Sequence, residues 1–459
     1  MSDNLTTWSN RLGIGGLYIF SLFAFLGTAG ANLGLFLMLV GLLVDWKRVW
    51  PIFRREPLFW LFLTFFAYVY VRASFAALEF PESADLQWDD ARGWAYLWLF
   101  LLVAWWTDGE ARRITRVLGL ALAGLTTKMV LELDHPTLER IVFDGVRYEF
   151  GFAAIAAGLF SGIALMGLAL FAPRALRNAQ SPGEKVVRFL LLVTLLLFFL
   201  QAHVATHSRG AWLAMLGGMV AVAGLVVVRY RAPFFNLWSG KRVLMLLGGV
   251  LLLGWTVAMN SDVIGKRMGQ AEGVLLEIVS NGLDVEQVPY TSLGKRVHMA
   301  HFGFQRFLDR PLFGWGPGSR IMRLLGPEHA ESRLEEEEIR KLNQPHLHNG
   351  YLSVLVRLGL VGFVLFAGAT VIVVRGLWRG YKTGRMSNSH VLFLVGAMIE
   401  TAIWNLSDSR IVHVDFAFLT ILIVGTMYSW RLHERKREGG YSTKSCQTDM
   451  LRRYAVDVA

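Results

Sequence analysis

Apolar blocks of membrane-spanning length recur along the whole chain and leave little choice of fold. They stand at 12–27, 32–45, 58–76, 94–107, 115–132, 150–172, 187–204, 211–228, 243–259, 350–374, 390–407 and 413–430. About 17–25 apolar residues cross a bilayer as a helix, and a helix satisfies its own backbone hydrogen bonds there. The sequence therefore predicts an all-α polytopic membrane protein with about twelve transmembrane helices.

The composition argues against a soluble fold. Of the 459 residues 54% are hydrophobic, and they include 31 Phe and 16 Trp. A soluble chain of this length would divide into domains whose polar surfaces cover their cores. Here only short polar or basic stretches separate the apolar blocks. The single cysteine, Cys446, excludes an internal disulfide framework.

The basic residues follow a pattern that predicts the orientation of the helices. The net charge is +11, and most of the cations stand in short loops beside apolar blocks. Lys and Arg mark the cytoplasmic side of membrane proteins. With the N-terminus inside, the loops after the second, fourth, sixth, eighth, tenth and twelfth blocks all carry basic clusters. We therefore expect both termini to be cytoplasmic, and we expect no nucleic-acid partner.

One connection, 260–349, is far longer than the others and lies outside in this assignment. Apolar residues recur at helical spacing over 297–308, which is typical of an amphipathic helix on a membrane surface. The expected organisation is nine transmembrane helices at 1–259, a large external loop with short helices at 260–349, three transmembrane helices at 350–430 and a cytoplasmic tail at 431–459.

Arginines on the external side are candidates for binding an anion. Arg209, in Ser208-Arg209-Gly210, begins the eighth block on the side where cations are less common. Arg296 stands at the start of the amphipathic stretch, and Arg147 precedes the sixth block. Each has a structural alternative. Arg209 can snorkel to lipid headgroups, whereas Arg296 and Arg147 can be paired with a carboxylate or solvated.

Two histidines, His346 and His348, stand at the entry to the tenth block. Their spacing could suit a metal, but no cysteine or suitably spaced carboxylate completes a site. A neutral imidazole can take a hydroxyl proton near neutral pH. We therefore expect one of the two to act as a general base without a metal. A structural histidine at the membrane interface is the alternative.

Two further features of the long loop have simple structural explanations. The Gly- and Pro-rich turn at 311–318 contains Gly316 and Gly318 and can expose backbone N–H groups to a ligand. A purely structural turn is favoured, because such residues punctuate loops everywhere. The four consecutive carboxylates at 335–338 point in different directions around a helix, which favours a solvated face over a metal site.

At these motifs the sequence resembles the O-antigen ligase family, which shares a signature region with O-antigen polymerases and O-linked oligosaccharyltransferases. The matching pieces are, in the family's order, 208–210, Arg296, 309–318, 348–352 and 358–362. They cover roughly residues 200–365. His346 is a departure from the family's pattern because it stands near the expected histidine. Which imidazole is the base therefore stays open, although His348 matches the family's position better.

The resemblance implies a substrate and a place. In the family a polysaccharide on an undecaprenyl pyrophosphate carrier is transferred to a sugar of lipid A-core. This occurs on the periplasmic face of the bacterial inner membrane, without a nucleotide sugar. We expect that this chain needs no cofactor. The resemblance assigns catalysis to His348 or His346 with Arg209 and Arg296. The residues expected to bind substrate are Arg147, Ser208, Arg209, Arg296, Gly316, Gly318, Asn349 and Tyr351.

Two other functions compete with the ligase. An O-antigen polymerase is a related enzyme whose donor and acceptor both ride on the lipid carrier. A transporter or flippase for a lipid-linked glycan belongs to another class, and ionisable residues buried in the middle of spans would favour it. The candidates for such residues are few, and several stand near the ends of spans: Lys128, His203, Glu400 and Asp415.

Overall fold

The computed structural model is a helical bundle. It describes residues 2–230, 258, 260–265, 269, 285, 288, 291–319, 346–384 and 386–438, and these contain no strand. The helices are α1 (Ser2–Leu26), α2 (Thr28–Val44), α3 (Trp46–Phe53), α4 (Pro57–Glu79), α5 (Ala84–Tyr96), α6 (Phe100–Thr107), α7 (Ala111–Leu131), α8 (His135–Phe143), α9 (Ala154–Arg177), α10 (Pro182–Ala205), α11 (Arg209–Tyr230), α14 (Gly294–Asp309), α17 (Gly350–Lys382), α18 (Asn388–Trp404) and α19 (Val414–Glu438), with short 3₁₀ turns at Pro81–Ser83 and Leu97–Leu99.

Seven of these helices are long and apolar enough to cross a membrane: α1, α4, α7, α9, α10, α11 and α17. The number is eight if α2 and α3, bent by 91° at their junction, form one span. The all-helical, multi-pass class is therefore confirmed, whereas the count of twelve stays a prediction. The expected span at 94–107 falls on the end of α5, a 3₁₀ turn and α6. The expected span at 243–259 and the acidic run at 335–338 lie outside the described residues, apart from residue 258.

Apolar side chains cover the outside of the bundle as well as its core. On α10, Val187 is 65% exposed and Leu190 is 58% exposed, and on α11 Leu213 is 62% exposed. Contiguous apolar surface of this kind is unusual on a soluble monomer. It is the surface expected where helices face lipid instead of water, because lipid tails are as apolar as these side chains.

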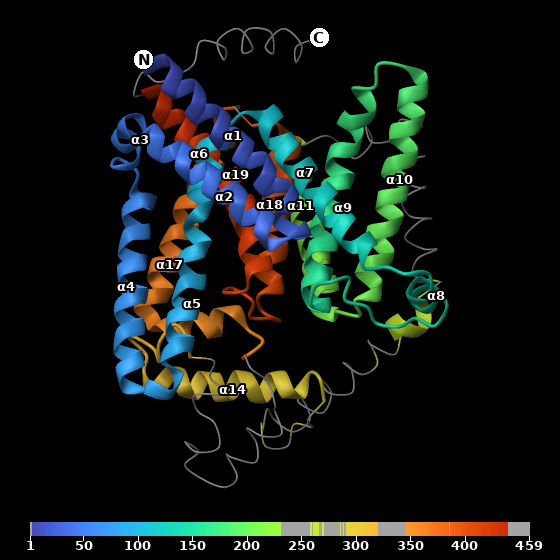
Figure 1. The fold of residues 1–459 in the computed structure, drawn as a ribbon. Coiled ribbons are helices and arrows are strands. Elements are labelled where there is room, and N and C mark those ends of the chain that lie inside the picture. The colour runs from blue at the N-terminus through green and yellow to red at the C-terminus, as the bar shows by residue number, and fades with distance from the viewer. Residues whose placement is uncertain are drawn as a thin grey trace.

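The charged groups at one end of the bundle tie three connections together. Arg435 Nε of α19 lies 2.6 Å from Oε1 of the buried Glu56, in the turn between α3 and α4. Lys436 Nζ lies 3.0 Å from Asp108 Oδ1, in the turn between α6 and α7. Figure 1 shows the start of α1 at this end and α14 at the opposite end. Three of the connections expected to face the cytoplasm thus lie together, and which side of the membrane they face stays a prediction.

Helix α17 is broken at Gly359, and the Gly- and Pro-rich turn fills the break. Gly359 has φ +62°, so the backbone hydrogen bonds of the helix are interrupted there. The turn replaces them. Its N–H groups at 315 and 316 donate to the carbonyls of 356 and 357, at 2.9 Å each. Its carbonyls at 311 and 312 accept from the N–H groups of 360 and 361, at 2.8 and 3.1 Å. The carbonyls of 356 and 357 and the N–H groups of 360 and 361 therefore keep hydrogen-bond partners despite the break, as a membrane setting requires.

A buried ion pair fastens the first half of α17 to α5. Arg357 Nη1 lies 3.2 Å from Asp90 Oδ2, and both side chains are less than 10% exposed. The same nitrogen donates to the carbonyl of Pro317 at 3.3 Å, so the turn, α5 and α17 meet at one point. A buried pair of this kind is costly to break, because either partner alone would leave an uncompensated charge. This anchoring fixes residues 350–358 and the loop before them.

We predict that Gly359→Ala destabilises the protein. The backbone conformation at this position, φ +62° and ψ −171°, alone costs a residue with a Cβ about 1–3 kcal/mol. The added Cβ would also lie 2.3 Å from the carbonyl oxygen of Leu312, which is too close for any carbon–oxygen contact. The melting temperature of the full-length protein in detergent should therefore fall by several degrees.

Gly368→Ala is the matched control in the same helix. A Cβ there meets only Leu61 Cδ2, at 3.6 Å, which is ordinary van der Waals contact. Its melting temperature should stay at or above that of the wild type, because alanine is the better helix former. Equal melting temperatures for the two variants would contradict the role assigned to the break.

Candidate active site

A cavity of about 470 Å³ collects most of the residues that the sequence singled out. Its lining consists of Arg147, Ile155, His207, Ser208, Arg209, Ser292, Lys295, Arg296, Met299 and His348. The five predicted residues among them come from four separate stretches of the chain. The volume lies within the roughly 300–1,000 Å³ that is typical of small-molecule sites.

Four helix N-termini converge on this cavity. Ser208 directly precedes α11, and His348 stands one residue before the N-cap of α17. Arg296 lies in the first turn of α14, and Ile155 lies in the first turn of α9. The N-terminus of a helix carries a partial positive charge and unpaired N–H groups. The backbone therefore adds to the positive potential of the side chains.

The side chains of the lining are rich in fixed positive charge. Arg147, Arg209, Lys295 and Arg296 all contribute, and the lining holds no carboxylate among the described residues. Burial lowers the pKa of Arg296, and the neighbouring charges of Arg209 and Arg147 lower it further, while Asp408 opposes them. Cations that repel one another in this way are stabilised by an anion. Guanidinium groups suit phosphate well, because their planar N–H groups can donate in pairs.

His346 and His348 meet the buried carboxylate of Asp408. Asp408 Oδ1 lies 3.4 Å from His348 Nδ1 and 3.9 Å from His346 Nδ1. The backbone N–H of Ser409 donates to the same oxygen at 2.8 Å. The two imidazole rings lie 4.1 Å apart between their centres. The three side chains form one cluster at the edge of the cavity. Of the three, only His348 lines the cavity.

The environment sets the charges of this cluster. Burial, reinforced by the neighbouring His348, lowers the pKa of His346 to about 4, so His346 is neutral at pH 7. Burial alone would raise the pKa of Asp408, but the hydrogen bonds from His348 and from the backbone N–H of Ser409, together with electrostatic interaction with both imidazoles, bring it below its usual range. Asp408 is therefore ionised at neutral pH and can stabilise a proton on its imidazole partner.

Backbone contacts hold the cluster in place. The N–H of Gly350 donates to the carbonyl of Asn405 at 2.7 Å, and Ser409 Oγ donates to Ser353 Oγ at 2.6 Å. These bonds tie the loop before α19 to the start of α17. His348 itself has φ +49° and His207 has φ +52°, both in the left-handed region that residues with a Cβ seldom adopt. Such strained positions cluster at functional sites.

The same cluster has the composition of a metal site. One ligand atom from each of His346, His348 and Asp408 lies within 4.8 Å of the others. Two imidazoles and a carboxylate suit zinc and other transition metals. No suitably spaced carboxylate near the two histidines in the sequence indicated such a site, because Asp408 is distant in the chain. The cluster can therefore either move a proton or hold a metal, and metal-free chemistry stays a prediction.

Asn349 and Tyr351 lie outside the cavity and have structural partners. The Asn349 side chain caps α17, accepting from the N–H of Leu352 at 3.0 Å. The Tyr351 hydroxyl donates to the carbonyl of Ala402 in α18 at 2.9 Å. These contacts explain why the two residues stand beside His348 in the chain. We do not include them in the proposed site.

Gly316 and Gly318 also lie outside the cavity, against α5. Gly318 N–H donates to Gln87 Oε1 at 2.8 Å, and a Cβ on Gly318 would lie 2.2 Å from the carbonyl of Leu86. Gly316 has φ +120°, and a Cβ there would lie 2.6 Å from Gln87 Oε1. The glycines are therefore needed for close packing of the turn, which is the structural explanation that the sequence favoured.

Three ionisable residues of the site were not singled out from the sequence. Lys295 directly precedes Arg296, and His207 belongs to the motif that contains Arg209, so both could have been noted from their neighbours. Asp408 had no such signal, because nothing in its loop indicates which helix it faces. Arg410, two residues on, forms an ion pair with Asp415 at 2.9 Å.

Comparisons with known proteins bear on the region around this cavity. Residues 191–367 match the family model described as O-Antigen ligase. An uncharacterized protein of Haemophilus influenzae is 27% identical over 161 residues, which is 34% of this chain. The match covers 35% of that relative, so the chain spans about a third of its length. The chain therefore carries, at residues 191–367, a region of the O-antigen ligase family, as its motifs predicted.

Proposed function

We propose that the protein is a glycosyltransferase that moves O-antigen polysaccharide from undecaprenyl pyrophosphate to a sugar of lipid A-core. One observation carries the proposal: a single cavity lined by three arginines and a lysine also contains a histidine backed by a carboxylate. The family match supports membrane glycan transfer in general terms. The roles of individual residues follow from the chemistry of this reaction.

In the proposed reaction the arginines stabilise the leaving group. The bond between the anomeric carbon and the pyrophosphate oxygen breaks, and the pyrophosphate leaves with its negative charge. Arg209 and Arg296 would hold this charge by paired hydrogen bonds, with Arg147 at the rim. The four helix N-termini add preorganised positive potential. Pyrophosphate is a good leaving group, so no general acid and no cofactor is required.

His348 is the proposed general base. It would take the proton of the acceptor hydroxyl as that oxygen forms its bond to the anomeric carbon. Asp408 would hold the ring by its Nδ1, leaving Nε2 to accept the proton, and would stabilise the resulting imidazolium. His346 is the weaker candidate. With a pKa of about 4 it accepts a proton poorly at neutral pH, and it does not line the cavity.

The proposed setting is the bacterial inner membrane, with both termini in the cytoplasm and the cavity on the periplasmic side. This orientation rests on the basic clusters of alternate connections. The connections after α3, α6 and α19 are three of these, and they lie together at the end of the bundle opposite to α14. A lipid-borne donor and acceptor would then reach the cavity from the outer leaflet.

A transporter gains little support from the buried ionisable groups. Lys128 pairs with Glu132, and Asp415 pairs with Arg410. His203 Nδ1 lies 2.9 Å from the carbonyl of Gly158. These three have local structural partners. Only Glu400, buried in α18, has both carboxylate oxygens without a hydrogen bond among the described residues.

The first test is transfer by the purified full-length protein. Wild type mixed with carrier-linked glycan and lipid A-core should form the new glycosidic bond, whereas a transporter forms none. His348→Ala should lower the rate by about 10²–10⁴-fold, which is the usual contribution of a general base. Excess EDTA should leave the wild-type rate unchanged. Loss in EDTA that zinc restores would show instead that the histidine cluster holds a metal.

Asp408→Asn should lower kcat by at least about tenfold and leave the KM of both substrates nearly unchanged. The amide keeps the size of the side chain but cannot stabilise the imidazolium that forms in the transition state. Asp309→Asn, which alters an exposed carboxylate paired with Arg306, is the control and should keep full activity. An unchanged kcat in Asp408→Asn would remove Asp408 from the mechanism.

A strain carrying His348→Ala separates the ligase from the polymerase. Loss of ligation should leave long polymer on the carrier, and we expect this outcome. Loss of polymerisation would leave single repeat units on the carrier, and that result would favour the polymerase. Normal long-chain lipopolysaccharide in this strain would contradict both roles for His348. The carrier-linked and lipopolysaccharide fractions are resolved by gel electrophoresis.

A further inference from the structure

The cavity of about 470 Å³ that Arg209, Arg296 and His348 line is called the anion-binding cavity below. We propose that the acceptor lipid, not the donor, lies along two further cavities next to it. Its acyl chain would lie in an apolar groove between α7 and α9, and its sugars would fill a larger polar cavity. The inference rests on the proposed function, because it assigns a substrate to the same site. The order in which the cavities follow one another supports it.

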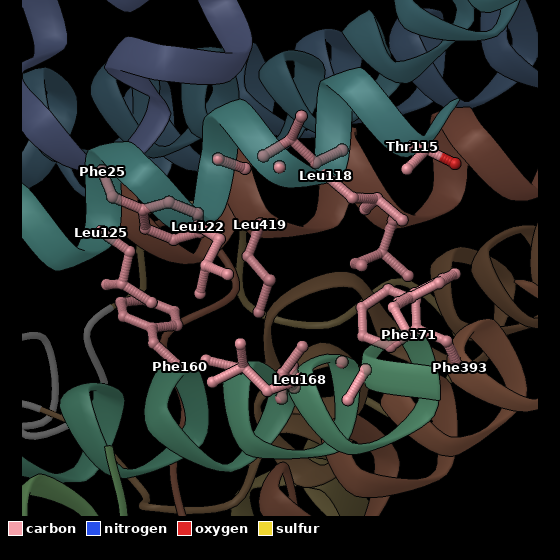
Figure 2. A pocket seen from close by; sticks show the side chains of 18 of the residues that line it. Phe25, Thr115, Leu118, Leu122, Leu125, Phe160, Leu168, Phe171, Phe393 and Leu419 are labelled. Atoms are coloured by element: carbon pink, nitrogen blue, oxygen red, sulfur yellow. The ribbon is translucent and has the colours of Figure 1, made fainter. Parts of the chain in front are cut away.

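The apolar groove opens on the outside of the bundle at α7, where Thr115 and Gly119 of its lining are exposed. It has a volume of about 230 Å³, and Thr115 is the only residue of its lining with a polar side chain. Figure 2 shows Leu122 and Leu125 of α7 facing Phe160 and Leu168 of α9 across the space. From position 115 to position 125 the groove runs about 15 Å along α7 at 1.5 Å per residue. That is about half of the roughly 30 Å hydrocarbon core of a bilayer.

The second cavity has the lining of a saccharide site. Its volume is about 990 Å³. Carboxylates of Glu132, Glu149 and Asp415 line it together with Lys128 and Arg410, and several aromatic rings stand among them. Carboxylates accept hydrogen bonds from hydroxyl groups, and cations donate to them. Glu149 is exposed and forms no ion pair with any residue that the structure describes, so it remains available to a hydroxyl-rich ligand.

Each pair of neighbouring cavities shares a lining residue. Phe25 lines both the apolar groove and the polar cavity. Arg147 lines both the polar cavity and the anion-binding cavity. The order is therefore groove, polar cavity, anion-binding cavity. A lipid that entered the groove with its chain would place the next part of its structure in the polar cavity.

This order fits an acceptor and does not fit a donor. In a polyprenyl pyrophosphate donor the pyrophosphate follows the lipid chain directly, and the glycan comes after it. With its chain in the groove, the donor's pyrophosphate would stand at Phe25, separated from Arg209 and Arg296 by the polar cavity. In an acceptor glycolipid the sugars follow the chain, and the reacting hydroxyl is at their far end. That hydroxyl would reach the anion-binding cavity near Arg147 and His348.

Gly119 offers a way to fill the groove. It lines the groove, and a Cβ added there meets no atom within 4 Å. Gly119→Trp should therefore fold and occupy the space of the chain. Gly224→Trp on α11 is the matched control. A Cβ there also meets nothing within 4 Å, and Gly224 lines none of the three cavities.

The experiment measures binding of purified lipid A-core to the full-length protein in nanodiscs, without donor. Gly119→Trp should weaken binding by about tenfold or more, while Gly224→Trp should bind as the wild type does. In the transfer reaction, Gly119→Trp should raise the KM for lipid A-core and leave the KM for the carrier-linked donor within about twofold. Glu149→Gln should raise the acceptor KM by about threefold or more, because it loses a charged hydrogen-bond acceptor.

The outcomes separate this inference from the proposed function. Transfer by the wild type with unchanged acceptor binding in Gly119→Trp would overturn the inference and leave the proposed function standing. A raised donor KM with an unchanged acceptor KM would assign the groove to the donor and also overturn it. Weakened lipid A-core binding in Gly119→Trp without any transfer by the wild type would support the groove assignment and refute the proposed function.

Discussion

The break in α17 at Gly359 is the constraint on which the site depends. A continuous helix would satisfy its own backbone, but it would carry residues 350–358 along a single axis. The break redirects this segment, and the turn at 311–318 supplies the backbone partners that the helix loses. The buried pair of Arg357 and Asp90 then fixes the segment against α5. This arrangement fixes the start of α17 and with it the position of His348.

The site concentrates positive charges, and the rest of the fold must stabilise them against their mutual repulsion. Helix N-termini and cationic side chains meet in one cavity, where burial and, to a smaller extent, repulsion from Arg209 and Arg147 lower the pKa of Arg296. The nearby carboxylate of Asp408 opposes this lowering of the Arg296 pKa, although its closest partners are the histidines. Such an arrangement is preorganised for an anionic ligand, because the protein has spent the energy of assembly before the ligand arrives. The anion proposed here, pyrophosphate, matches this charge.

The separation of polar and apolar cavities gives the proposed reaction a direction. The anion-binding cavity and the apolar groove share no lining residue, whereas the polar cavity shares Arg147 with the first and Phe25 with the second. A membrane enzyme that joins two lipid-linked molecules needs two separate paths for lipid chains, because both substrates are anchored in the bilayer. The groove between α7 and α9 provides one of them.

The sequence by itself determined the helical membrane class and the motifs with Arg209, Arg296 and His348, because apolar length and residue type are local properties. It also favoured a structural role for the turn with Gly316 and Gly318. Only the tertiary structure decided which of these residues share a cavity, since their stretches are distant in the chain. It alone brought Asp408 to the histidines, because a carboxylate in a loop carries no sign of the helix end it will face.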